Sequence, residues 1–147
     1  MNIVNEVNIN FKSKSTNESF ARAAISAFVL SLDPTIAELS DIKTAVSEAV
    51  TNCIVHAYPD TIGTIYINVK ITDTQKIIIK IRDKGVGIPD IKQAMQPLYT
   101  TSGEERAGLG FAVMQSFMDN IKVRSASNKG TTVTMEKTII RTNYDKR

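Results

Sequence analysis

Apolar residues recur with a period of two in several parts of this chain, and this period indicates half-buried strands. Residues 7–11 and 65–71 alternate between apolar and polar side chains, and in the next such segment Ile77, Ile79 and Ile81 alternate with Ile78, Lys80 and Arg82. The last two segments are separated only by a turn at Asp73-Thr74, which is typical of an antiparallel hairpin. Two further strands are predicted, one from Ile121 and one around residues 133–135, with the turn Asn128-Lys129-Gly130 between them.

Apolar residues at spacings of three and four predict helices elsewhere. The first helix is expected to begin at a capping box formed by Ser15 and Glu18. Pro34 suits the first position of the second helix, which should end before Pro59. A third helix is expected from Phe111. The apolar stripes are Phe20, Ala24, Phe28 and Leu32; Leu39, Ile42, Val46, Ala49, Val50 and Cys53; and Phe111, Met114, Phe117 and Met118.

The order strand, helix, helix, strand, strand, loop, helix, strand, strand predicts the fold class. Helices on one face of a mixed, mostly antiparallel sheet give an α+β two-layer sandwich. The 147 residues fit a single domain, 1–147, whose polar tail at 141–147 should fray. Residues 83–110 hold five glycines and two prolines but little periodicity. A long irregular stretch in a compact domain is usually functional.

Composition excludes several classes of protein. One Cys and one His can form neither an internal disulfide nor a His/Cys zinc site. The net charge of +3 comes without a run of basic residues, so no nucleic-acid partner is expected. The N-terminus does not resemble a signal peptide, and the longest apolar stretch, broken by Arg22 and Ser26, is too short to span a membrane. The expectation is a cytoplasmic protein without a membrane partner.

Two pairs of glycines mark candidate chemistry. Asp83 follows a buried strand and precedes Gly85 and Gly87, whereas Gly108 and Gly110 stand where a helix begins. Glycine lets a ligand approach the backbone closely, and free N–H groups at a helix start suit phosphate. Either pair alone is more often an ordinary turn, but both pairs around one loop favour phosphate binding. The spacing matches neither a Walker A loop nor a dinucleotide fingerprint.

The second predicted helix presents a polar row at the edge of its apolar face. Glu48, Asn52 and His56 are four residues apart and therefore neighbours. The Asn52 carbonyl could bind Mg²⁺, and Glu48 could accept a proton from an attacking hydroxyl. The alternative is a solvated helix edge, with His56 interacting only with the helix dipole. Cys53 lies on the apolar stripe and is expected to be a core residue.

These segments resemble the GHKL ATP-binding superfamily, which includes gyrase and histidine kinases. The whole chain, roughly residues 5–138, is similar to the anti-sigma F factors of spore-forming bacteria, which are small serine kinases. One departure is Ala57, where relatives commonly have glycine. The matching motifs are Glu48-Ala49-Val50-Thr51-Asn52 (N box), Asp83-x-Gly85-x-Gly87-Ile88-Pro89 (G1 box), Gly108-Leu109-Gly110-Phe111 (G2 box) and Gly130-Thr131-Thr132 on the final strand.

The resemblance implies a role for each matching position. Asp83 would accept a hydrogen bond from the adenine amino group, helped by Thr131, and Asn52 would bind Mg²⁺. Glu48 would be the general base for a serine hydroxyl, and Arg22 would belong to the surface that holds a sigma factor, although a solvated helix arginine is the alternative. Residues 90–107 would form the ATP lid. The further nucleotide-binding positions would be Gly85, Gly87, Ile88, Thr100, Thr101, Arg106, Gly108, Leu109, Gly110 and Phe111.

The resemblance also implies partners and an activity. The chain would be a homodimeric anti-sigma factor that uses ATP and Mg²⁺, with ATP or ADP setting which partner it holds. It would bind a sporulation sigma factor and phosphorylate a serine of an anti-anti-sigma factor. Three alternatives stay open: the catalytic domain of a histidine kinase, a nucleotide-binding module without transfer activity, and the kinase for a general-stress sigma factor. The histidine kinase is disfavoured because His56, the only histidine, lies in the N box.

Overall fold

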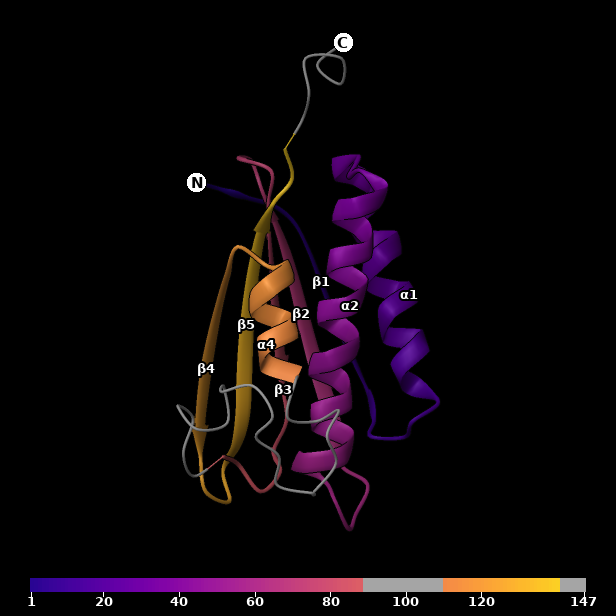
Figure 1. Ribbon diagram of the computed structural model, residues 1–147, viewed down its shortest axis with the longest axis vertical. Coiled ribbons are helices and arrows are strands. Elements are labelled where there is room, and N and C mark those ends of the chain that lie inside the picture. Colours follow the sequence, from indigo (N-terminus) through magenta and orange to yellow (C-terminus); the bar gives the residue numbers. More distant parts are fainter. Residues whose placement is uncertain (89–109, 141–147) are drawn as a thin grey trace.

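The computed structural model describes residues 1–88 and 110–140, which form one layer of strands and one layer of helices (Figure 1). The helical layer contains short 3-10 and π-helical turns besides the α-helices. The elements in chain order are β1 (Ile3–Lys12), α1 (Asn17–Val29), the 3-10 turn η1 (Leu30–Leu32), α2 (Ile36–Asn52), the π-helical turn η2 (Cys53–Ala57), β2 (Thr64–Thr72), β3 (Lys76–Arg82), α4 (Gly110–Phe117), β4 (Asn120–Ala126) and β5 (Gly130–Thr138).

The described strands form one sheet in the order β1-β2-β3-β5-β4. Every neighbouring pair is antiparallel, so this sheet contains no parallel pair and is more regular than the mixed sheet that was predicted. The helices cover one face, with α2 between α1 and α4 (Figure 1). The predicted α+β sandwich is therefore confirmed.

The core lies between the helices and the covered face of the sheet. Alternate residues of the central strands β2 and β3 are almost fully buried there, and α1, α2 and α4 supply the facing side chains. None of the helices in residues 1–88 and 110–140 is both long and apolar enough to cross a membrane. The buried strand residues are Ile65, Ile67, Val69, Ile71, Ile77, Ile79 and Ile81.

Both predicted hairpin turns are present. The β2–β3 turn places Gln75 at φ 68°, and the β4–β5 turn places Asn128 at φ 63° and Gly130 at φ 88°. Asparagine and glycine tolerate this left-handed region better than other residues do. The turn chemistry that the sequence indicated at 128–130 thus matches the backbone that forms.

The predicted beginning of α1 is wrong, and its predicted apolar stripe is confirmed only in part, since Leu32 is buried and Phe28 packs against the core. Thr16 precedes the helix and its side chain makes no capping hydrogen bond, while Glu18 bonds to other side chains. The buried row is Ala21, Ile25 and Val29, whereas Phe20 is 51% exposed. The apolar face of α1 consists of two adjacent rows of residues. The row packed against the sheet begins at Ala21, one residue after Phe20. Phe20 still packs edge-to-face against Phe11 of β1, with ring centroids 6.0 Å apart.

The capping box of this structure is at the start of α2. Glu38 N donates to Thr35 Oγ1 over 3.1 Å, and Thr35 N donates to Glu38 Oε1 over 2.9 Å. This reciprocal pair gives hydrogen-bond acceptors to two backbone N–H groups at the start of the helix. Pro34 therefore precedes the cap, two positions before the first helical residue Ile36, and the prediction that it opens the helix is wrong.

Candidate functional site

Asp83 lies directly after β3, and its side chain is buried, with 4% exposed. Its Oδ1 accepts hydrogen bonds from Gly85 N at 2.9 Å and from Thr131 N at 3.2 Å. Its Oδ2 lies 3.5 Å from the Cys53 thiol, which donates to it. Burial raises the pKa of Asp83, and these three hydrogen bonds act in the opposite direction. The carboxylate is thus held in one orientation at the end of a buried strand.

The loop after Asp83 packs closely against two other segments. A Cβ atom on Gly85 would lie 2.1 Å from the carbonyl oxygen of Ala57, which accepts a hydrogen bond from Val86 N at 3.0 Å. Gly87 has φ 79°, and a Cβ there would lie 2.0 Å from the carbonyl oxygen of Ala126. Close packing of backbone therefore requires both glycines. The close approach at Ala57 exists although that residue is alanine, because Gly85 provides the space.

The β4–β5 hairpin forms the other wall around Asp83. Asp83 N donates to Thr131 O at 2.9 Å, which reciprocates the bond from Thr131 N to the carboxylate. The Thr131 hydroxyl lies 2.7 Å from Ser125 Oγ, and Ser125 Oγ accepts from Ile88 N at 2.7 Å. A Cβ on Gly130 would lie 2.2 Å from Asp83 O. The predicted residues Asp83, Ile88 and Thr131 are thus joined in one hydrogen-bonded network.

Tyr58 is a part of this site that sequence reasoning missed. Its hydroxyl donates to Thr64 O at 2.8 Å and accepts from Lys84 N at 2.6 Å, while burial raises its pKa. Its ring fills the space beside Gly63, where a Cβ would lie 2.2 Å away. Tyr58 therefore fixes the segment that follows Asp83. The only sequence signal was a tyrosine directly after the end of a predicted helix.

Ser125 was missed for a different reason. It lies near the end of β4, where serine is unremarkable in the sequence. Only the pairing of β4 with β5, which sets Ser125 opposite Thr131, brings its hydroxyl into the network around Asp83. Its role thus depends on strand register, which the sequence pattern did not fix.

The polar row of α2 reaches the beginning of α4. Glu48, Asn52 and His56 are all partly buried, as a row at the edge of an apolar face should be. A Cβ on Gly110 would lie 3.1 Å from both Oδ1 and Nδ2 of Asn52. The Asn52 amide therefore lies against the first residue of α4. Glu48 lies one turn earlier on α2.

Adjacent residues of α2 and η2 connect the two halves of the site. Asn52 contacts Gly110 at the start of α4, and the next residue, Cys53, donates its thiol to Asp83. Burial raises the pKa of the Cys53 thiol well above its usual value, and the nearby Asp83 carboxylate adds to the effect. A thiol of this kind is unreactive, as expected for a core residue. The helix start and the buried carboxylate are thus parts of one site.

The remaining predicted nucleotide-binding positions fall into two groups. Thr100, Thr101, Arg106, Gly108, Leu109 and the expected lid at 90–107 fall outside the described residues. Phe111 is buried with 8% exposed, and its side chain belongs to the hydrophobic core.

Arg22 lies on α1, away from Asp83. Its guanidinium is 3.4 Å from Glu18 Oε1 and 3.5 Å from Ser47 Oγ, and the Ser47 hydroxyl also donates to Glu18. Its side chain remains 42% exposed. Arg22 is therefore oriented by neighbours on α1 and α2 but is still accessible to a partner.

The donor set fits a magnesium ion bound together with phosphate. Within residues 1–88 and 110–140, no group of three or more His, Cys, Asp or Glu residues could hold a metal. Mg²⁺ needs no such cluster, since it usually takes one or two protein oxygens and completes its shell with phosphate and water. The Asn52 carbonyl beside the N-terminus of α4 offers one such oxygen. Helix N-termini favour phosphate.

The sequence matches known proteins over nearly its whole length. Residues 11–137 match the family model of the histidine kinase-like ATPase domain. An anti-sigma F factor of Thermoanaerobacter sp. (strain X514) is 57% identical over 140 residues, which are 95% of this chain and 97% of that protein. The anti-sigma F factor of Bacillus licheniformis is 51% identical, over 90% of this chain and 92% of that protein.

Solved structures with little sequence similarity share the fold. The RsbU and RsbW domains of Rv1364c from Mycobacterium tuberculosis match with a TM-score of 0.68 at 15% identity, covering 95% of this chain and 34% of that one. The histidine kinase domain of the Erythrobacter litoralis EL346 blue-light activated kinase matches with a TM-score of 0.56 at 16% identity, covering 83% of this chain and 60% of that one. By its sequence and its fold, this chain belongs to the histidine kinase-like ATPase domain family and, within it, to the anti-sigma F factors.

Proposed function

We propose that this protein is an anti-sigma factor that binds a sporulation sigma factor and uses Mg-ATP to phosphorylate a serine of its anti-anti-sigma antagonist. The similarity to anti-sigma F factors supports the anti-sigma role, and the ATPase domain supports nucleotide binding. The observation that carries the enzymatic part is the contact of Asn52 with the start of α4, one residue before the contact of Cys53 with Asp83.

Each of these residues has a chemical task in the proposed function. The fixed Asp83 carboxylate accepts a hydrogen bond from the amino group of adenine, and Thr131 lies beside it. The Asn52 carbonyl binds Mg²⁺, which supplies positive charge to the phosphates. Glu48, one turn before Asn52, accepts the proton of the partner's serine hydroxyl as the general base. Asp83 and Thr131 select the base, while Asn52 and Glu48 act where phosphate is transferred.

Arg22 and the oligomeric state complete the proposal. Arg22 is exposed and fixed by Glu18 and Ser47, so it can contribute to the surface that holds the sigma factor. The assembly is proposed to be a homodimer. Sedimentation of the purified chain tests the dimer: a monomer at micromolar concentration would contradict that part without affecting the kinase.

Phosphate transfer to a serine is the decisive test. The chain would be incubated with labelled ATP, Mg²⁺ and candidate anti-anti-sigma proteins from sporulation and stress pathways, and any phosphoserine would be mapped. Glu48→Gln is the matched control, since it keeps the size of the side chain but cannot accept the proton. Label on a serine, lost in the control, is expected. Nucleotide binding without transfer to any candidate would instead favour a non-catalytic binding module, and transfer only to a stress-pathway protein would favour the general-stress kinase.

A further inference from the structure

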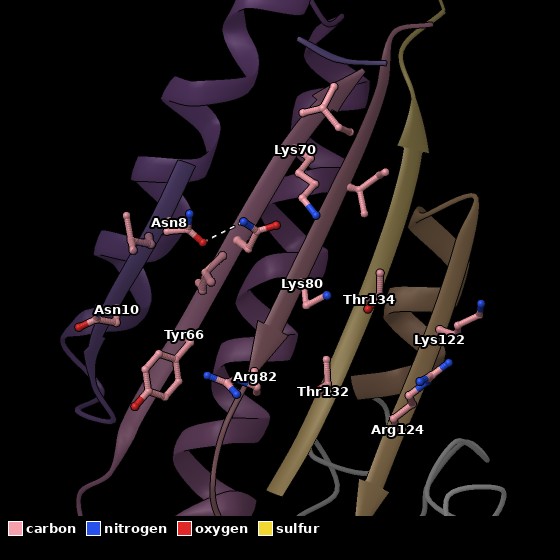
Figure 2. Close-up of a pocket in the computed structure, with 15 residues that line it drawn as sticks. Asn8, Asn10, Tyr66, Lys70, Lys80, Arg82, Lys122, Arg124, Thr132 and Thr134 are labelled. Carbon is pink, nitrogen blue, oxygen red and sulfur yellow. Dashed lines mark hydrogen bonds between the residues drawn. The ribbon is translucent and has the colours of Figure 1, made fainter. Parts of the chain in front are cut away.

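The face of the sheet turned away from the helices carries a group of basic side chains. Lys80 and Arg82 project from β3, and Lys122 and Arg124 project from β4 (Figure 2). All four side chains are exposed. We call these four residues the cationic face. None of the four has been assigned a role in nucleotide binding, although Arg82 and Arg124 line a hollow that Asp83 and Thr131 also border.

Strand register arranges the cationic face as two rows. Lys80 and Lys122 are both paired with Thr134, and Arg82 and Arg124 are both paired with Thr132. Each row thus has one cation on either side of β5, with a threonine between them. The two cations on one strand are about 7 Å apart along it, and the cations of one row are about 10 Å apart.

The carboxylates of this sheet face do not neutralise the four cations. Glu6 and Glu136 lie in the neighbouring row, opposite Lys70 and Ile78 respectively. Glu136 is paired with Lys76 at 3.1 Å, and Glu6 accepts a hydrogen bond from Asn68 at 2.6 Å. In the part of the chain that the structure describes, none of the four cations forms an ion pair. Like charges held this close favour an anionic partner.

The aromatic residue beside the cationic face argues against nucleic acid. Tyr66 of β2 is paired with Arg82 on this face of the sheet. Its ring already contacts the Arg82 guanidinium, 4.7 Å from the ring centroid, and the Lys84 ammonium, 5.2 Å from it. Single-stranded nucleic acids are usually bound by aromatic rings on which bases stack. A surface of cations and threonines without a free ring lacks that platform.

A second copy of this chain also fits poorly. Two cationic faces stacked on each other would bring four positive charges against four more, which is destabilising. An extended acidic segment fits better, because alternate residues of an extended chain repeat at about 7 Å. That repeat matches the spacing from Lys80 to Arg82 and from Lys122 to Arg124.

We propose that the cationic face is a docking surface for an extended acidic segment of another protein, with carboxylates at alternate residues. The carboxylates would pair with the cations of β3 and β4, and the Thr132 and Thr134 hydroxyls between them would bond to its polar groups. The surface lies on the opposite side of the sheet from the helices, including α1, which carries Arg22 (Figures 1 and 2). The proposal therefore stands whether or not the chain is a kinase.

Binding of a labelled peptide of alternating Glu and Thr would test the proposal. Fluorescence anisotropy would be measured at about 50 mM and about 300 mM NaCl, because screening weakens exposed charge pairs. The variant is Lys80→Gln with Lys122→Gln, and the matched control is Lys14→Gln with Lys43→Gln, which removes the same charge from exposed sites elsewhere. The expected result is an affinity lower by roughly two- to thirty-fold in the variant, with little change in the control.

Three results would overturn the proposal. The first is no binding of the peptide at low salt, or equal loss in variant and control. The second is tighter binding of an oligothymidine of similar length with the same dependence on Lys80 and Lys122, which would assign the face to nucleic acid. The third is self-association of the chain that is lost in the Lys80→Gln, Lys122→Gln variant, which would assign it to a second copy. Circular dichroism of all variants would verify folding.

Discussion

Gly85→Ala tests whether close backbone packing builds the nucleotide site. The added Cβ would start 2.1 Å from the Ala57 carbonyl oxygen, so backbone must move by about 1 Å to reach an ordinary contact. That movement would lengthen the 3.0 Å bond from Val86 N to Ala57 O beyond hydrogen-bonding distance. The lost bond costs about 0.5–1.5 kcal/mol, and the strain of overpacking about 1–3 kcal/mol. A loss of about 1.5–4.5 kcal/mol of unfolding free energy is expected.

Urea unfolding measures this loss, and Lys84→Ala is the control. Lys84 is exposed and adjacent, and its substitution leaves the backbone contact intact. It removes only the contact of the ammonium with the Tyr66 ring, so the stability of the control should stay within about 1 kcal/mol of wild type. Because Gly85 N also donates to Asp83 Oδ1, the affinity for a fluorescent ATP analogue should fall as well. A Gly85→Ala chain as stable as the control would refute the argument, since it would mean that the loop accommodates the methyl group freely.

Three further substitutions test the roles of single side chains. Asn52→Ala should abolish Mg²⁺-dependent ATP binding and leave the fold intact; normal affinity would remove Asn52 from the metal site. Glu48→Gln should keep ATP binding but slow phosphate transfer by roughly 10²–10⁴, and an unchanged rate would exclude it as the base. Asp83→Asn should weaken nucleotide binding yet be more stable to urea at pH 7, because burial raises the pKa of this carboxyl and disfavours its charged form. Because the pKa of Asp83 is raised in the folded state, the wild type loses stability as pH rises from the unfolded-state pKa of about 3.9 through the higher folded-state pKa. The advantage of Asp83→Asn should therefore vanish below about pH 3.9; a difference independent of pH would contradict it.

The strands could be predicted from the sequence because their pattern is simple. In β2 and β3, every second residue is buried and aliphatic, and the turn between them is short. The helices were harder because an apolar face can be more than one row wide. On α1, Phe20 and Ile25 both belong to apolar rows, but only contact with the sheet decides that the row of Ile25 is buried.

Helix beginnings were misassigned because capping motifs compete. Ser15 and Glu18 have the spacing of a capping box. The Glu18 carboxylate instead bonds to Arg22, one turn later on α1, and to Ser47 on α2. Thr35 and Glu38 have the same spacing and form the box. A local motif cannot reveal that a distant serine offers its carboxylate a better partner. Such choices depend on tertiary packing.

The residues of the candidate site that could be predicted are those that belong to a recognisable motif. Asp83, Gly85 and Asn52 were identified from motifs, and the structure connects them through Cys53 and Gly110. Tyr58 and Ser125 were not identified, because they support the site by bonding to backbone or to another hydroxyl. Residues of this kind have no motif of their own.

The cationic face could not be predicted from the sequence either. Lys80-Ile81-Arg82 and Lys122-Val123-Arg124 each alternate with an apolar residue, so each appears in the sequence as an ordinary strand with a polar side. About forty residues separate them, and β5 must lie between β3 and β4 before they share one face. A search for basic runs therefore missed this positive surface, since a sheet can assemble one from isolated residues.

The two ends of the proposed nucleotide site differ in how they are prepared for a ligand. At the Asp83 end, both carboxylate oxygens already accept hydrogen bonds, and Gly85, Thr131 and Tyr58 hold the surrounding backbone. A base that binds there would find its acceptor oriented, which reduces the entropy lost on binding. Selection of the base should therefore depend on this network more than on any change of shape. Tyr58→Phe would remove only the hydroxyl that bonds to Lys84 N, so it should weaken ATP binding without changing the ratio of Mg²⁺-dependent to Mg²⁺-independent affinity, whereas Asn52→Ala should change that ratio.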